Sequence, residues 1–85
     1  MRTVELLERA LAAAKSLGYG VRHEYLGGAG GGACEFGGRK WIFVDLALST
    51  EEQLEQVIAA LRGEPRALFA DPSPELRRLL SRRAA

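Results

Sequence analysis

Seven of the ten glycines in this 85-residue chain fall between Gly27 and Gly38. Glycine adopts positive φ freely and lets another backbone or a ligand approach closely, although it costs conformational entropy on folding. The run therefore predicts a segment with a geometric requirement. It is interpreted either as a wide connection between two strands or as a place where backbones cross closely. The loop 27–32 contains no lysine, serine or acid that would assign it a chemistry.

Two nucleotide-binding motifs can be compared with this run. The segment from Gly28 to Ala33 has the G-x-G-x-x-A spacing of a dinucleotide fingerprint. That fingerprint needs a helix N-terminus directly after it, whereas residues 34–36 are typical of a strand. A Walker A loop also fails, because Gly38 and Arg39 stand where Lys and Ser or Thr are needed. The sequence therefore predicts no nucleotide cofactor.

Composition indicates one globular domain over residues 1–85. The apolar fraction is 47%, and twelve basic against eleven acidic residues leave a net charge of +1. This balance excludes a global electrostatic drive toward nucleic acid or an anionic membrane. The single cysteine excludes an internal disulfide and suits a reducing compartment. The N-terminus carries acids within its apolar stretch, and no apolar stretch approaches the roughly 20 residues of a membrane span. We expect a cytoplasmic protein without a membrane partner.

Hydrophobic periodicity predicts the helices. Residues 3–17 carry a helical apolar stripe, with Thr3 as N-cap and Gly18 as the stop. Ser49 and Glu52 form a capping-box pattern that opens a second helix, which ends at Gly63. A short turn is expected around residues 68–69. Ser73 and the proline after it open a C-terminal helix over residues 73–83.

Between the helices, alternation predicts strands over residues 20–26, 33–36 and 39–46. The fold class is therefore α+β, in the order α-β-β-β-α-α. We expect a three-stranded antiparallel meander with the helices on one face. Gly37 and Gly38 form a two-residue hairpin turn, which pairs Phe36 with Arg39, Glu35 with Lys40 and Cys34 with Trp41.

This alternation divides the sheet into two apolar faces. An aromatic side would collect Val21, His23, Tyr25, Cys34, Phe36, Trp41 and Phe43, and an aliphatic side Leu26, Ala33, Ile42, Val44 and Leu46. One layer of helices covers only one face. Either the aromatic side is core, or the helices take the aliphatic side and leave the aromatics exposed near Arg39 and Lys40. Because the strand 41–46 is apolar on both sides, we expect it to be buried on both sides, by oligomerisation or by a partner.

The leading hypothesis is a non-catalytic protein–protein interaction module that forms a homo-oligomer. Its interaction residues would be Tyr25, Cys34, Phe36, Arg39, Trp41 and Phe43. The alternative is a small nucleic-acid-binding module that stacks bases on its aromatic side chains beside Arg39. A third hypothesis is an activity that depends on Cys34, next to the glycine loop.

The residue types present give little support for a catalytic or a metal site. Cys34 and His23 lack an orienting third group, so we expect Cys34 to be a buried structural residue and the protein not to be an enzyme. Zinc needs three or four protein ligands, and these two residues with Asp45 would barely supply them, so no metal is predicted. The arginines of the tail are interpreted as a solvated helix face, with phosphate contact as the alternative; they are Arg77, Arg78, Arg82 and Arg83.

The segment from Gly30 to Gln53 resembles small uncharacterised bacterial proteins that have a glycine–cysteine strand, an I/V-D strand end and an LS-x-E-E-Q helix start. It also resembles the stretch before the catalytic helix of ImmA/IrrE-type zinc metallopeptidases. That helix bears H-E-x-x-H, whose positions correspond to Ala59, Ala60 and Gly63 in this chain. None of these residues binds zinc or acts as a base, so the resemblance implies a scaffold without peptidase chemistry.

Overall fold

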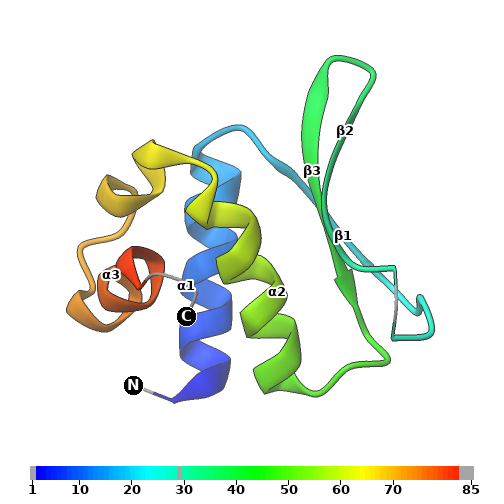
Figure 1. Ribbon diagram of the computed structural model, residues 1–85, viewed down its shortest axis with the longest axis horizontal. Coiled ribbons are helices and arrows are strands. Elements are labelled where there is room, and N and C mark those ends of the chain that lie inside the picture. Colours follow the sequence, from blue (N-terminus) through cyan, green and yellow to red (C-terminus); the bar gives the residue numbers. More distant parts are fainter. Residues whose placement is uncertain (1, 29, 83–85) are drawn as a thin grey trace.

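Three helices lie on one side of a three-stranded sheet in the computed structural model, which describes residues 2–28 and 30–82 (Figure 1). This arrangement is the α+β class predicted from the sequence, in the predicted order. The elements are α1 (Thr3–Ser16), β1 (Gly20–Glu24), β2 (Gly32–Phe36), β3 (Arg39–Asp45), α2 (Thr50–Arg62), the 3-10 helix η1 (Pro65–Phe69) and α3 (Pro74–Ser81).

The sheet is mixed, so the predicted antiparallel meander is wrong. Its strand order is β1-β3-β2, with β1 parallel and β2 antiparallel to the central β3. Strand β1 therefore ends at the same end of the sheet where β2 begins. The glycine-rich segment between them carries the chain past the end of β3 instead of turning back directly, and this crossing is why consecutive strands are not neighbours.

The predicted hairpin register is confirmed. Phe36 pairs with Arg39, Glu35 with Lys40 and Cys34 with Trp41. Gly37 and Gly38 have φ of 61° and 75°, values that glycine adopts without the steric cost of a side chain. A two-residue turn leaves a single register, which is why the sequence predicted it.

Local signals set most helix ends. The capping box is present: the Glu52 N–H donates to Ser49 Oγ, and the Ser49 N–H donates to Glu52 Oε1 at 3.0 Å. The pKa of Glu52 lies below its ordinary value, because the Ser49 N–H first, and the Ser49 hydroxyl second, bond to its carboxylate and outweigh the opposing effect of desolvation. Ser73 caps α3 as predicted. Thr3, however, lies inside α1, whose N-cap is Arg2.

Other predicted ends also move. The first strand stops at Glu24 rather than at residue 26, and α3 ends at Ser81. The predicted end of the last helix at residue 83 lies outside the described residues. The turn expected near residues 68–69 is part of η1. No helix in the described part of the chain combines the length and the apolar character that a membrane span requires.

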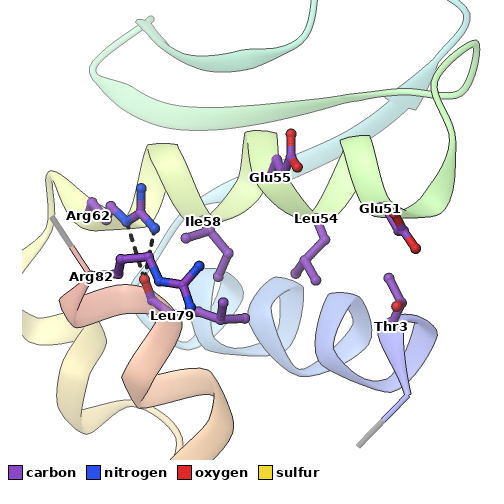
Figure 2. A pocket seen from close by; sticks show the side chains of 8 residues that line it. All are labelled: Thr3, Glu51, Leu54, Glu55, Ile58, Arg62, Leu79 and Arg82. Carbon is purple, nitrogen blue, oxygen red and sulfur yellow. Dashed lines mark hydrogen bonds between the residues drawn. The ribbon is translucent and has the colours of Figure 1, made fainter. Parts of the chain in front are cut away.

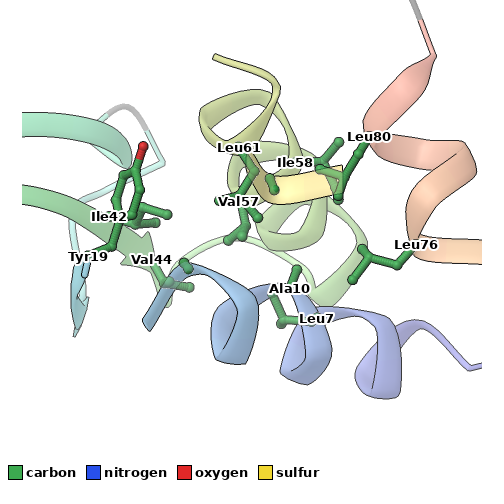
Figure 3. Close-up of a cluster of buried hydrophobic side chains, with 12 residues drawn as sticks. Leu7, Ala10, Tyr19, Ile42, Val44, Val57, Ile58, Leu61, Leu76 and Leu80 are labelled. Atoms are coloured by element: carbon green, nitrogen blue, oxygen red, sulfur yellow. The ribbon is translucent and has the colours of Figure 1, made fainter. Parts of the chain in front are cut away.

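The core lies between the sheet and the helices (Figure 3). Ile42 and Val44 of β3 are buried and point toward the helices, whereas Trp41 and Phe43 on the other face are only half-buried. The helices contribute Leu7, Ala10 and Ala14 from α1, Val57, Ile58 and Leu61 from α2, and Leu76 and Leu80 from α3. Of the two arrangements left open by the sequence, the helices take the aliphatic face.

The predicted face of β1 is wrong. Val21 pairs with Ile42 and Arg22 with Phe43, so Val21 lies on the helix side and Arg22 on the aromatic side. The sequence alternation of β1 was correct, but which of its two sides faces the helices is set by its register with β3, which alternation does not specify.

Replacing Leu76 by Ala should lower the free energy of unfolding by about 2–5 kcal/mol, because the side chain is fully buried and its removal leaves a cavity. The half-buried Leu79 of the same helix is the matched control, and Leu79→Ala should cost less than half as much. Urea denaturation followed by Trp41 fluorescence measures both. Equal costs would show that α3 does not dock through Leu76.

Candidate functional site

The face of the sheet that the helices leave open carries a row of aromatic rings. We call Cys34, Phe36, Arg39, Trp41 and Phe43 the aromatic face. The Phe36 and Trp41 rings are stacked, with centroids 5.7 Å apart and planes 16° apart, and Trp41 and Phe43 centroids are 6.4 Å apart. The Arg39 guanidinium carbon lies 4.9 Å from the centre of the Trp41 ring. Phe36 is 59% exposed, so the row is a solvent-facing surface.

The Trp41 ring of this row lies against a glycine of the neighbouring strand. Gly20 of β1 is the register partner of Trp41, and a Cβ on Gly20 would overlap the indole ring. The absence of a side chain there lets the indole lie flat over the neighbouring strand. The position of Trp41, and with it the stacking of Phe36, therefore depends on the residue type at position 20.

Charges at this face are nearly balanced. Arg22, on the same side of β1, donates from Nη2 to Glu24 Oε1 at 2.9 Å. Arg39 rests against Trp41. Lys40 points to the other side, where its Nζ lies 3.9 Å from Glu64 Oε2 and 5.9 Å from the Tyr19 ring centre. The face therefore offers rings with few unpaired charges.

The structure brings together five of the six predicted interaction residues. Tyr25 lies just beyond the end of β1, is 80% exposed and takes part in neither ring contact of the face. Cys34 belongs to the face, but it is exposed, so the expected burial is wrong. The reason is that β2 is an edge strand, and among the described residues no element covers its aromatic side.

Cys34 and His23 are not brought together. His23 lies on β1 opposite Val44, on the helix side, whereas Cys34 lies on β2 opposite Trp41, and β3 separates the two strands. Strands β1 and β2 do not pair with each other, because β3 lies between them. Among residues 2–28 and 30–82, no three His, Cys, Asp or Glu side chains gather closely enough to hold a metal ion.

Asp45 holds the glycine-rich loop in place. Its carboxylate has no solvent exposure and accepts the N–H groups of Leu26 (2.9 Å), Gly28 (2.6 Å) and Ala47 (2.9 Å). Burial acts to raise the pKa of Asp45, but the three N–H donors outweigh it and the pKa lies below its ordinary value.

Sequence reasoning missed this role of Asp45. The available signal was a lone acid that ends an apolar strand in a chain with a long run of glycine amides. Gly31 of the same loop packs against α2, where a Cβ would overlap the Gln56 side chain. Position 29 of the loop lies outside the described residues.

The helices form a groove of about 390 Å³ on the far side from the sheet (Figure 2). Leu54, Ile58 and Leu79 make it apolar, and the rest of its lining is Thr3, Glu51, Glu55, Arg62 and Arg82. Arg62 donates from Nε (3.3 Å) and Nη2 (3.0 Å) to the Leu79 carbonyl oxygen, so it joins α2 to the end of α3. The residues that line the groove include neither cysteine nor histidine.

The arginines of the tail do not extend the aromatic face. Arg77, Arg78 and Arg82 are exposed on or just after α3, in the helical layer and away from the sheet (Figure 1). Residue 83 lies outside the described residues. Phosphate contact by this group stays a prediction.

Comparisons with protein-family models, with curated proteins and with solved structures gave no match. The resemblances drawn from the sequence therefore stay predictions. In the structure, the three positions that correspond to H-E-x-x-H straddle the end of α2, since Ala59 and Ala60 lie in its last turn and Gly63 is its C-cap.

Gly20→Ala should displace the Trp41 indole and lower the free energy of unfolding by about 1–3 kcal/mol, as overpacking does. The emission of Trp41 should shift to longer wavelength as the ring becomes more exposed. Gly63→Ala is the matched control, because φ there is −80° and the new Cβ would meet only ordinary contacts. It should be neutral or stabilising by up to about 1 kcal/mol. A fully stable Gly20→Ala variant would contradict the seating of Trp41.

Asp45→Asn should loosen the glycine-rich loop, because an amide offers one acceptor oxygen and presents an NH2 group to the remaining donors. Since folding lowers the pKa of Asp45, its stabilising effect is present above the unfolded pKa of about 3.9 and is lost as pH falls through the folded pKa. The gap between the urea midpoints of wild type and variant should therefore be full at pH 7 and close below about pH 4.

Amide exchange locates the Asp45 effect. The Leu26 and Gly28 N–H groups should exchange faster in Asp45→Asn at pH 7. Glu8→Gln, at an exposed helix position, is the control and should leave both amides unchanged. Unchanged exchange of both amides in Asp45→Asn would contradict the role of Asp45 in holding the glycine-rich loop.

Proposed function

We propose that this protein is a non-catalytic, cytoplasmic interaction module whose aromatic face takes part in self-association. The observation that carries the proposal is the stack of Phe36 on Trp41, continued by Phe43, on a sheet face without a covering layer among the described residues. Aromatic residues and arginine are the types that dominate protein–protein contacts. A second copy is the partner that the face suits, because its charges are balanced within one chain.

The alternative, stacking of nucleic-acid bases, rests on the same rings and on Arg39. Proteins that bind single strands combine such rings with a positively charged groove that follows the phosphates. At this face Arg22 is engaged by Glu24 and Arg39 lies against Trp41. The whole chain has a net charge of only +1. These charges favour a protein partner.

Sedimentation tests the proposal. The wild type should form dimers or larger species as its concentration rises from about 10 μM toward 1 mM, the range of modest protein affinities. Phe36→Ala should weaken this association about tenfold or more, as loss of a central aromatic contact does. Phe69→Ala is the matched control, since Phe69 is 82% exposed on η1, and it should leave association unchanged.

Two outcomes would overturn the proposal. One is a wild type that stays monomeric over the whole range. The other is binding of single-stranded oligonucleotides that quenches Trp41 fluorescence and weakens steeply with salt, which would favour the nucleic-acid alternative. The single tryptophan makes that second measurement specific to the aromatic face.

A further inference from the structure

The aromatic face is too small to hold a second copy alone. Each strand pair of the sheet is five residues long, so three strands cover roughly 240 Å² of sheet plane. A stable interface buries about 800 Å² on each partner. If the chain self-associates, another element must contribute, and the edge of the sheet next to this face is the nearest one.

The two edges of the sheet differ in their protection. Edge strands avoid pairing with other chains by carrying charged side chains or proline. Strand β1 has Arg22, His23 and Glu24 in succession, whereas β2 has a single charge, Glu35. Residues 33–36 are all exposed, and the hairpin tip stands clear of the helices (Figure 1). Strand β2 is therefore the accessible edge.

From these observations we propose that two copies of this chain join through β2, antiparallel to each other and centred on Cys34, to form a six-stranded sheet. The inference rests on the self-association proposed above and names its geometry. We assign a second copy as the partner of this edge because β2 is complementary to itself in this register, both in its backbone hydrogen-bonding groups and in its side chains.

The backbone fits a two-fold axis at Cys34. The two-residue turn makes Phe36 and Arg39 a hydrogen-bonded pair, and alternation makes Cys34 and Trp41 the next one. Ala33 and Glu35 then direct their N–H and C=O groups outward. In the dimer Ala33 of each copy pairs with Glu35 of the other, and Cys34 faces its own counterpart in a non-hydrogen-bonded pair.

The side chains fit the same register. Phe36 of one copy comes opposite Gly32 of the other, where no side chain competes for space, and an aromatic ring across from a strand glycine covers its backbone. Glu35 comes opposite Ala33, so like charges do not face each other, and its register partner within the chain is Lys40, whose Nζ lies 3.9 Å from Glu64 Oε2. The two aromatic faces then lie side by side on one sheet, which covers part of the exposed Phe36 ring.

Cys34 supplies a reporter of this register. In a non-hydrogen-bonded pair the two Cα atoms are about 4.5 Å apart, within the roughly 4.4–6.8 Å that a disulfide spans. Diamide, which takes up two electrons and two protons from a pair of thiols, should convert the wild type to a covalent dimer. In a Cys34→Ala background, Ala12→Cys places an exposed control thiol on α1. It should cross-link at least tenfold more slowly.

Shifted cysteines test the register itself. In the Cys34→Ala background, Ala33→Cys and Glu35→Cys proteins should each cross-link poorly alone, because like positions are diagonal, about 7–8 Å apart. Mixed together they should form the heterodimer, since positions 33 and 35 face each other at about 5.5 Å. Equal amounts of homodimer and heterodimer would overturn the proposed register.

Ala33→Pro tests the edge hydrogen bonds. Proline removes an N–H that β3 does not use, and edge strands tolerate it, so far-UV circular dichroism should stay unchanged. Dimer affinity should fall about tenfold or more. A dimer in sedimentation without preferential cross-linking at Cys34 would overturn the β2 pairing and leave the proposed function standing. A strict monomer would overturn both.

Discussion

The order of the strands depends on the contact between the Asp45 carboxylate and the N–H groups of the loop that follows β1. That loop must pass the end of β3 to reach β2, and a chain crossing there has backbone donors without strand partners. A carboxylate at the last position of β3 satisfies two of them at once. Gly27 and Gly28 let the backbone take the conformations that this crossing requires, since both have positive φ. The glycine-rich run thus lets the chain cross the end of β3. The carboxylate that accepts its N–H groups comes from Asp45, which lies 17 residues after Gly28.

Placing β3 in the centre has a direct consequence for its side chains. The helices bury Ile42 and Val44, and alternation then directs Trp41 and Phe43 to the opposite side, where the described chain has no second layer. Partial shelter comes from within the face: Gly20 accommodates the indole, Phe36 stacks on it and Arg39 covers it. These contacts leave Phe36 mostly exposed. The same constraint that gives the protein its core therefore gives it an apolar surface.

Sequence reasoning succeeded where a short segment determines its own geometry. The Gly37-Gly38 turn allowed one register, Ser49 and Glu52 formed their reciprocal cap, and Ser73 capped α3. It failed where the outcome depends on a distant partner. The alternation of Val21 and Arg22 is the same for a parallel or an antiparallel neighbour, so it could not place β1 beside β3. The exposure of Cys34 followed from that same strand order, and the role of Asp45 required knowing which loop passes above it.

The aromatic face and the β2 edge are connected through the small residues of β2. Gly32, Ala33 and Cys34 give this strand little side-chain bulk on either face, so it contributes one large apolar group, Phe36, next to the turn. A strand built this way gains little from the helices, and its ladder with β3 uses only one of its two edges. Its remaining backbone groups and its one ring can both be satisfied by an identical strand running in the opposite direction. Strand β1 lacks this property, because its three consecutive polar side chains give a partner little apolar surface to cover.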